Sequence, residues 1–234
     1  MSDRVPLAFL FDVDNTLLDN DAVERDYREH LIREAGPEAT GRLWAVFEDL
    51  RSELGYADYL GALQRYRKDN LHDPRLLCLG GFLLDYPFAG RLYPGALEAL
   101  AHAASLGTTA ILSDGDVVFQ PRKIDRSGIR RAVQGRVLVY IHKEDELADV
   151  EQFYPADRYV LVDDKLRILT AVKRIWGARV TTVFVRQGHY AHDPAILAEF
   201  PPADVTIDAI GDLLSLDSHA LLEVPASSTI GPTT

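Results

Sequence analysis

The sequence is poor in several features that mark particular classes of protein. Only one of its 234 residues, Cys78, is a cysteine, which excludes an intramolecular disulfide and a metal site built from several cysteines. No apolar run approaches the roughly 20 residues that a bilayer-spanning helix needs. The first residues, MSDRVPLAFLFDVD, lack the apolar stretch and cleavage site of a signal peptide. We therefore expect a soluble cytoplasmic protein.

Positive charge is also scarce. Lysine and arginine number 25 against 36 acidic residues, which makes the formal net charge −11. Nucleic acids and anionic lipids are usually bound by a basic face, so we expect neither a nucleic-acid partner nor a membrane partner. Hydrophobic residues make up 47% of the chain, enough for a buried core in one domain or in a core with a smaller insertion. The oligomeric state stays open.

What the chain does contain is a series of short apolar runs rich in β-branched and aromatic residues. Such runs are typical of strands buried on both faces. Helical patterns at 94–106, 144–153 and 166–176 separate the later runs, which predicts a doubly wound, mostly parallel α/β sheet. The predicted strands cover residues 7–11, 108–112, 136–141, 159–162 and 180–185.

One long interval interrupts this alternation. Between the first strand and Pro94 the chain shows helical spacing instead, for example at Leu43, Phe47 and Leu50. A stretch of this length with its own periodicity is a folded module and not a connector. We predict three regions: a core domain of residues 1–18 and 91–220, an inserted all-helical cap at 19–90, and a loose C-terminal tail at 221–234.

Each of the first four predicted strands ends in side chains that can carry chemistry. Ligands of an open parallel sheet bind outside the carboxyl ends of its strands, so we expect these side chains to meet at one edge. They are Asp12 and Asp14 after the first strand, Ser113 after the second, Lys143 after the third, and Asp163 with Asp164 after the fourth.

This set of side chains suits a reaction at phosphorus assisted by Mg²⁺. Clustered carboxylates repel one another unless a cation neutralises them, and Mg²⁺ prefers carboxylate and phosphate oxygens. Lys143 and Ser113 can hold a phosphoryl group, whose transfer needs mainly positioning and charge neutralisation. One acid can attack phosphorus while a second moves protons. The expected ligand is a small phosphorylated metabolite.

In this order the motifs resemble the haloacid dehalogenase-like (HAD-like) superfamily of phosphotransferases. The resemblance rests on DVDNT at 12–16, on Ser113 and Lys143, and on the acid pair at 163–164, and it covers about residues 5 to 186. The insertion after DVDNTLL looks like the helical cap that such proteins carry between their first and second motifs. The resemblance therefore implies the same α/β core with an inserted cap.

The resemblance also implies a role for each motif residue. Asp12 would be the nucleophile and a Mg²⁺ ligand, and Asp14 would be the general acid/base, with its backbone carbonyl on the metal. Thr16 looks like the residue that braces the first loop. Ser113 and Lys143 would hold the phosphoryl group. Asp163 and Asp164 would complete the metal site.

Two departures from the family pattern bear on these roles. Asp114 stands where such families often have asparagine, and the fourth motif has Val162 in place of glycine with no further acid at 167 or 168. The adjacent acids at 163–164 therefore have to supply both carboxylates of the fourth motif. Lys165 can form a salt bridge with one of them. As the resemblance has it, dehalogenases lack an acid where this chain has Asp14, which favours chemistry at phosphorus.

The function predicted from the sequence is a Mg²⁺-dependent phosphatase that works through a phospho-aspartate intermediate. A phosphomutase on the same scaffold is the nearest alternative, and the motifs do not separate the two. A catalytically silent protein that binds a phosphorylated ligand is a third hypothesis, which the intact acids Asp12 and Asp14 disfavour.

Several other conspicuous residues have simpler interpretations. The basic run that includes Arg122, Lys123 and Arg126 is typical of a solvated helical face. Cys78 reads as a small buried residue, because the sequence pairs no base with it. The Gly-His-Tyr segment at 188–190 is more typical of an ordinary turn than of a substrate contact. His142 is expected to have a structural role, pointing away from the site of Lys143.

Overall fold

A six-stranded parallel sheet forms the centre of the protein. The computed structural model describes residues 4–216 and 221. The strand order is β3-β2-β1-β4-β5-β6, which places the first strand in the middle with β2 and β4 on either side. All five predicted strands are present, and a sixth, at the sheet's edge, was not predicted. The strands are β1 (Val5–Phe11), β2 (Thr108–Asp114), β3 (Val137–Tyr140), β4 (Ala156–Asp163), β5 (Val180–Val185) and β6 (Val205–Ile207).

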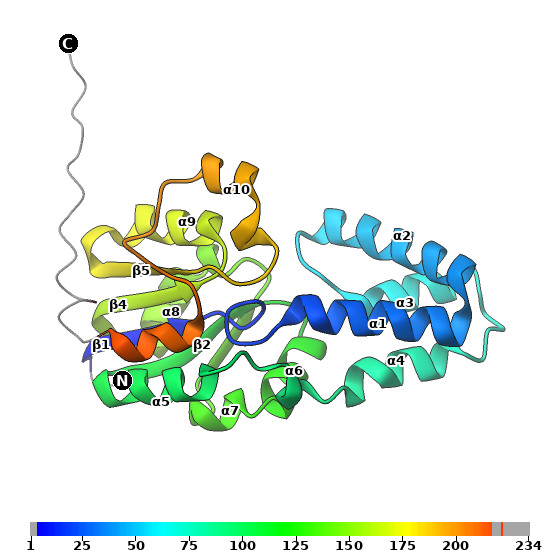
Figure 1. Ribbon diagram of the computed structural model, residues 1–234, viewed down its shortest axis with the longest axis horizontal. Helices are drawn as coiled ribbons and strands as arrows, with labels where there is room; N and C mark the ends of the chain where they lie inside the picture. Colours follow the sequence, from blue (N-terminus) through cyan, green and yellow to red (C-terminus); the bar gives the residue numbers. More distant parts are fainter. Residues whose placement is uncertain (1–3, 217–220, 222–234) are drawn as a thin grey trace, which may run out of the picture.

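Helices cover both faces of this sheet, which confirms the doubly wound α/β class. Side chains of β1 alternate between two hydrophobic clusters, with Phe9 and Phe11 in one and Ala8 and Leu10 in the other. Figure 1 shows α5 and α7 on one side of the sheet and α9 on the other. These helices are α5 (Ala96–Leu106), α6 (Phe119–Arg126), α7 (Ile129–Ala132), α8 (Leu147–Phe153), α9 (Leu166–Trp176) and α10 (Pro194–Glu199). Short 3₁₀ helices lie at Phe88–Arg91, Lys143–Asp145, Gly177–Arg179, Tyr190–His192 and Ile210–Ser215.

A second group of helices lies beside the sheet, on the right in Figure 1, and is called here the helical module. Local signals start and stop its helices. The Asp19 carboxylate accepts a hydrogen bond from the Ala22 amide at the start of α1, and Pro37 begins α2. Gly55, with φ of 79°, ends α2 in the left-handed conformation. The module comprises α1 (Asn20–Ala35), α2 (Pro37–Leu54), α3 (Tyr59–Arg67) and α4 (Leu76–Asp85).

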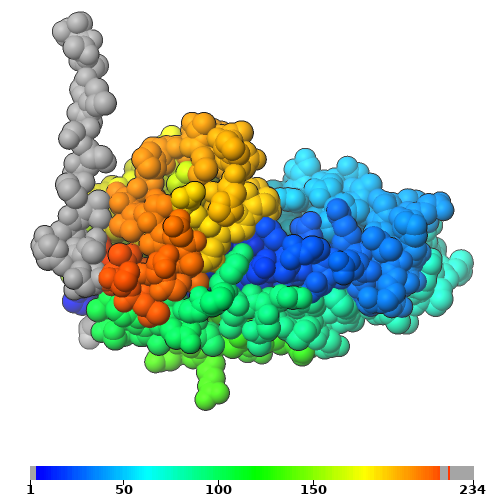
Figure 2. Space-filling view, viewed as in Figure 1, coloured from blue at the N-terminus to red at the C-terminus, as the bar shows by residue number. Residues whose placement is uncertain are grey.

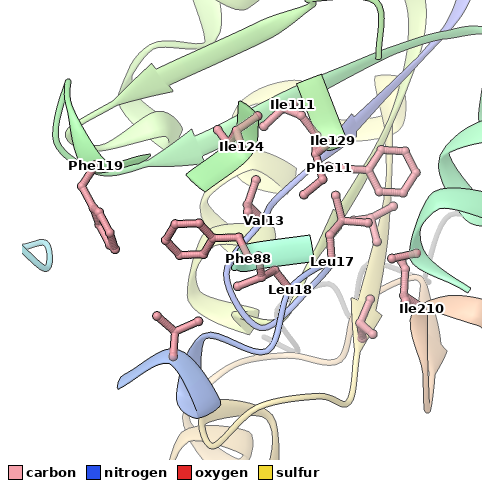
Figure 3. Packing of buried hydrophobic residues seen from close by; sticks show 14 of the residues in the cluster. Phe11, Val13, Leu17, Leu18, Phe88, Ile111, Phe119, Ile124, Ile129 and Ile210 are labelled. Atoms are coloured by element: carbon pink, nitrogen blue, oxygen red, sulfur yellow. The ribbon is translucent and has the colours of Figure 1, made fainter. Parts of the chain in front are cut away.

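Aromatic side chains join the helical module to the sheet layer. Phe88, which is fully buried, lies next to Val13 and Leu18 in the view of Figure 3. Its ring meets that of Phe119 on α6 at 5.7 Å, and Phe119 in turn meets Tyr59 of the module at 5.8 Å. Edge-to-face pairs at these separations are favourable beyond their burial. One continuous core therefore runs from the sheet into the module.

Some local expectations were wrong. Cys78 is exposed on α4, because its neighbour Leu79 and also Leu83 occupy the buried face of that helix. The predicted helix at 144–153 is divided into a 3₁₀ helix and α8. The predicted strand at 136–141 is shorter at both ends, since β3 covers only Val137–Tyr140 and Ile141 is exposed.

The C-terminal region is described only in part. Leu221 is buried in the main core cluster, and its carbonyl oxygen accepts a hydrogen bond of 2.6 Å from the Thr181 hydroxyl. The rest of the expected tail, residues 222–234, lies outside the described residues. Among the helices of residues 4–216 and 221, none combines the length and the apolar character that crossing a membrane requires.

Replacing Phe88 should test the core that joins sheet and module. We expect Phe88→Ala to lower the free energy of unfolding by about 3–5 kcal/mol, because it leaves a cavity where a fully buried ring packs. The matched control is Phe153→Ala, which truncates a ring that is 54% exposed and should cost about 0.5 kcal/mol or less. Denaturant unfolding measures both, and equal losses would contradict the packing described.

Candidate active site

The loop after β1 begins the site. Asp12 follows the strand directly and is buried, and its amide donates to the Val162 carbonyl of β4 at 3.0 Å. The loop then turns tightly, because the amides of Thr16, Leu17 and Leu18 all donate to the Val13 carbonyl. Thr16 is fully buried, and its carbonyl accepts a hydrogen bond of 3.2 Å from the Gln187 side chain.

Three carboxylates meet at the tips of β1 and β4. Asp12, Asp163 and Asp164 are each at most 3% exposed, and each offers an oxygen within 4.8 Å of those of the other two. Oδ2 of Asp12 and both carboxylate oxygens of Asp164 have no hydrogen-bond partner within residues 4–216 and 221. Burial disfavours the charged form of a carboxylate, and it raises the pKa of Asp163 to about 6 and that of Asp164 well above its ordinary value.

Lys143 neutralises part of this charge. Its Nζ lies 2.5 Å from Asp12 Oδ1 and 2.7 Å from Asp163 Oδ2, and it also donates to the Leu112 carbonyl at 3.3 Å. Burial opposes the ammonium form. The surrounding carboxylates, those of Asp12, Asp163 and Asp114, outweigh burial and hold the pKa of Lys143 well above its ordinary value. Lys143 is therefore a permanent cation that ties the tips of β1 and β4 together.

The end of β2 adds a hydroxyl and a fourth carboxylate. Ser113 is buried, and its Oγ accepts a hydrogen bond of 2.9 Å from Gln120 on α6. The Asp114 carboxylate accepts a hydrogen bond of 2.7 Å from the Lys143 amide. Burial raises the pKa of Asp114 above its ordinary value, although the positive charge of Lys143 opposes this rise. Asp114 thus fixes the backbone of the turn that presents Lys143.

Asp14 lies in different surroundings from Asp12, although only two residues separate them. Its side chain is 27% exposed and its Oδ1 accepts a hydrogen bond of 2.6 Å from Lys123 Nζ. Lys123 is only 2% exposed, so its assignment to a solvated helical face was wrong. The one signal that pointed to its burial is its position four residues after Phe119, which puts both on the same face of α6.

A cavity of about 420 Å³ opens beside Asp14, between the helical module and the sheet layer. Figure 2 shows the surface hollowed where the orange segment of α10 meets the light-blue segment of α2. Both polar and apolar side chains face this space. They include Phe47, Arg51 and Tyr56 from the module and Asp14, Lys123, Lys165, Tyr190 and Phe200 from the other side.

The segment at 188–190 is more than the ordinary turn expected for it. His189 contacts Asp21 of α1 twice, through its ring Nδ1 at 2.7 Å and its amide at 2.8 Å. Arg51 of α2 donates a hydrogen bond to the Tyr190 hydroxyl. Both residues line the cavity. This segment therefore fastens the helical module to the sheet layer at the rim of the cavity.

Lys165 and His142 also have defined surroundings. The Lys165 ammonium forms no ion pair with Asp163 or Asp164 in the described part of the chain. It lies 5.5 Å from the centre of the Tyr190 ring, while its amide donates to Asp163 at 2.8 Å. The His142 ring packs against Gly55, where an added Cβ would come within 2.7 Å of it. His142 thus contacts the helical module and takes no part in the carboxylate cluster.

The sequence-predicted residues therefore fall into three groups in space. Asp12, Lys143 and Asp163 are in direct contact, and Asp164 completes their carboxylate cluster. Asp14 faces the cavity beside them. Ser113 is buried at the end of the neighbouring strand β2. A metal fits this arrangement, because a hard divalent cation prefers carboxylate oxygens and several of these have no partner in the described residues.

Comparison with other proteins identifies the family. A protein from Burkholderia xenovorans LB400, assigned to the haloacid dehalogenase-like hydrolases, is 62% identical, has a TM-score of 0.88, and covers 92% of this chain and 100% of its own. Two more distant structures share the fold. An L-2-haloacid dehalogenase from Xanthobacter autotrophicus is 20% identical, with a TM-score of 0.59 and coverage of 89% and 96%. A protein from Thermotoga maritima assigned as a β-phosphoglucomutase is 16% identical, with a TM-score of 0.57 and the same coverage.

No curated protein matches the chain. The family model of haloacid dehalogenase-like hydrolases matches residues 6–152, which is more than half of the sequence and includes the first three motifs of the site. On this match and on the likeness to the Burkholderia protein, the chain belongs to the haloacid dehalogenase-like hydrolase family.

Proposed function

We propose that the protein is a Mg²⁺-dependent phosphatase that hydrolyses a small phosphomonoester through a phospho-aspartate intermediate. The observation that carries the proposal is the buried group of three carboxylates, two of which pair with Lys143, together with Asp14, which faces a cavity next to the group. The first group suits a metal and a phosphoryl group, and Asp14 suits proton transfer to a leaving oxygen.

The metal would be held by Asp12, Asp163 and Asp164, together with the backbone carbonyl of Asp14. The support for this is chemical, since these acids supply oxygen donors, and Asp12 and Asp164 have oxygens without a protein partner in the described residues. Bound Mg²⁺ would supply positive charge to the oxygens of the phosphoryl group. Lys143 would add a second positive charge from the side of β3.

The side chains divide the two steps of the reaction between them. An Asp12 oxygen attacks phosphorus, the bond between phosphorus and the ester oxygen breaks, and Asp14 donates a proton to the departing alcohol. In the second step Asp14 takes a proton from water as the water oxygen attacks the phospho-aspartate. Inorganic phosphate leaves and Asp12 is restored. Lys143 and Ser113 hold the phosphoryl oxygens throughout both steps.

The helical module serves as the cap in this proposal. The cavity between module and sheet, about 420 Å³, lies within the range of roughly 300–1,000 Å³ usual for small-molecule sites. It would hold the organic part of the ester, with the phosphate directed toward Asp12. This supports a small phosphorylated metabolite as the substrate, because the cavity is bounded on both sides by side chains.

Two other activities occur on related scaffolds. A dehalogenase expels a halide, which needs no proton, so the presence of Asp14 beside the cavity favours a phosphate ester. A phosphomutase would use the same groups and return the phosphoryl group to a sugar instead of to water. Product analysis separates these activities, since only the phosphatase releases inorganic phosphate and an alcohol from every ester it accepts.

Replacing the nucleophile tests the proposal directly. In a screen of sugar, nucleotide and small-acid phosphates with Mg²⁺, we expect activity in the wild type and a loss of about 10³-fold or more in kcat for Asp12→Asn. Acid quenching during turnover should trap phosphate on the wild-type chain and none on the variant. The control is Asp204→Asn, which changes a carboxylate bound to Lys173 and Thr182 outside the site.

Three results would count against it. Hydrolysis that survives Asp12→Asn would remove this residue as the nucleophile. A wild type that hydrolyses no ester of the screen and takes up no phosphate mimic such as BeF₃⁻ would remove the phosphatase itself. Phosphate transferred to a second sugar with no release of inorganic phosphate would favour the mutase.

Asp164→Asn tests the metal site by stability. Without metal this change should raise the unfolding midpoint, because it removes a buried carboxylate that has no partner in the described residues. Wild type at a Mg²⁺ concentration about ten times its Kd should gain about 1.4 kcal/mol, and Asp164→Asn should gain little.

Thermal unfolding with and without Mg²⁺ measures these changes. Asp204→Asn again serves as the control, since it should lower the midpoint and leave the response to Mg²⁺ unchanged. An Asp164→Asn variant that responds to Mg²⁺ as the wild type does would contradict the assigned site.

A further inference from the structure

We infer that Lys123 is a positioning residue that fixes the Asp14 carboxylate for proton transfer to the leaving oxygen. This inference rests on the proposed function, and it concerns a residue outside the four motifs. Lys123 lies on α6, far in sequence from Asp14, and lines the same cavity.

Lys123 is buried to an extent that few lysines reach. Its side chain is 2% exposed, and its Nζ donates to Asp14 Oδ1 at 2.6 Å and to Asn20 Oδ1 at 2.9 Å. Asp14 is the only carboxylate with which it forms an ion pair in the described part of the chain. Removing an ammonium from water is costly unless it gains charged and hydrogen-bonded partners. Its pairing with Asp14 is therefore the main compensation for its burial.

The helix that carries Lys123 is firmly held. Asp116 accepts hydrogen bonds from the amides of Val118 and Phe119 at the start of α6, at 2.8 and 2.7 Å. Ile124, next to Lys123, is fully buried. The Phe119 ring lies 5.1 Å from Lys123 Nζ, which adds a favourable contact for the cation. A rigid helix therefore holds one end of the contact, while Asp14 sits on a loop with a partly exposed side chain.

The hydrogen bond to Asn20 extends the contact to the helical module. Asn20 is the first residue of α1, so the Lys123 ammonium joins the β1 loop, the sheet layer and the start of the module at one point. With two acceptors fixed around Nζ, the ammonium has a defined direction. Its hydrogen bond then determines which rotamer Asp14 adopts beside the cavity, and so where the other carboxylate oxygen, the one that would exchange the proton with the substrate, points.

If Lys123 positions Asp14, its loss should affect some substrates more than others, which a purely structural role of Lys123 would not predict. A leaving group that departs readily as an anion, such as p-nitrophenolate, gains little from a proton donor, whereas an alkoxide needs one. A misplaced Asp14 should therefore slow the cleavage of alkyl phosphates much more than that of p-nitrophenyl phosphate. Damage to the whole site would slow both substrates by the same factor.

The test measures single-turnover rates of cleavage for p-nitrophenyl phosphate and for an alkyl phosphate that the wild type accepts. We expect Lys123→Met to slow the alkyl ester about 10- to 100-fold and the aryl ester about threefold or less. Lys123→Arg, which keeps the positive charge, should restore part of the alkyl rate. Lys173→Met is the matched control, because Lys173 also pairs with an aspartate, Asp204, at 2.7 Å but outside the site.

A double-mutant cycle with Asp14→Asn completes the experiment. If Lys123 acts through Asp14, adding Lys123→Met to Asp14→Asn should slow the alkyl ester by no more than about twofold further. Additive losses, equal losses for both esters, or a Lys123→Met rate equal to that of the wild type would each overturn the inference and leave the phosphatase standing. A wild type that hydrolyses no ester of the phosphatase screen would overturn the phosphatase and, with it, the role of Lys123.

Lys123→Met could lose activity because it no longer folds, and the Lys123→Arg variant separates that effect from a loss of positioning. Circular dichroism shows whether Lys123→Met keeps the wild-type content of helix and strand. If it does not, Lys123→Arg alone decides, because a positioning role predicts a changed ratio of alkyl to aryl rates in a folded enzyme. A folded Lys123→Arg variant with the wild-type ratio and an additive effect on Asp14→Asn would reject the inference.

Discussion

Crowding of negative charge at the carboxyl edge of the sheet is the constraint on which the rest of this structure depends. Asp12, Asp163 and Asp164 are buried together at the tips of two adjacent parallel strands, and in the described residues only Lys143 forms ion pairs in this group, with Asp12 and Asp163. A fold selected only for stability would not retain such a group, because buried charges without partners destabilise. The central place of β1, between β2 and β4, is what makes the crowding possible, since it brings the ends of three motifs within reach of one another.

Two acids that are neighbours in sequence receive different surroundings from this arrangement. Asp12 continues the strand into the buried cluster, whereas Asp14 lies within the tight turn that follows and faces the cavity. In the proposed mechanism, these separate environments would let one carboxylate stay close to a metal while the other exchanges protons with a substrate. The contacts of His189 with Asp21 and of Tyr190 with Arg51 hold the helical module over that cavity. The division of labour and the closure of the site thus depend on the same few loops.

Much of the fold could be predicted from the sequence, because strands of a parallel sheet are buried on both faces and read as continuous apolar runs. The edge strand β6 was missed, since three residues, Val205–Ile207, leave no such run. The order of the motifs likewise predicted that Asp12, Lys143 and the acids at 163–164 lie together. It did not predict the burial of Lys123, because the basic residues around it on α6 are typical of an exposed face. Cys78 was misplaced for the opposite reason, since apolar neighbours surround it in sequence while the helix turns it outward. Side-chain partners across the cavity depend on how the helical module packs against the sheet layer. Local sequence patterns do not predict this packing.

A crystal structure of the protein with Mg²⁺ and fluoroberyllate would test the central claim most directly, because it shows both the metal and the acceptor of the phosphoryl group. The account predicts an ion held by Asp12 and the acids at 163–164, with beryllium bonded to an Asp12 oxygen and its fluorides near Lys143 and Ser113. An ion bound away from this edge of the sheet, or beryllium bonded to any other side chain, would contradict it.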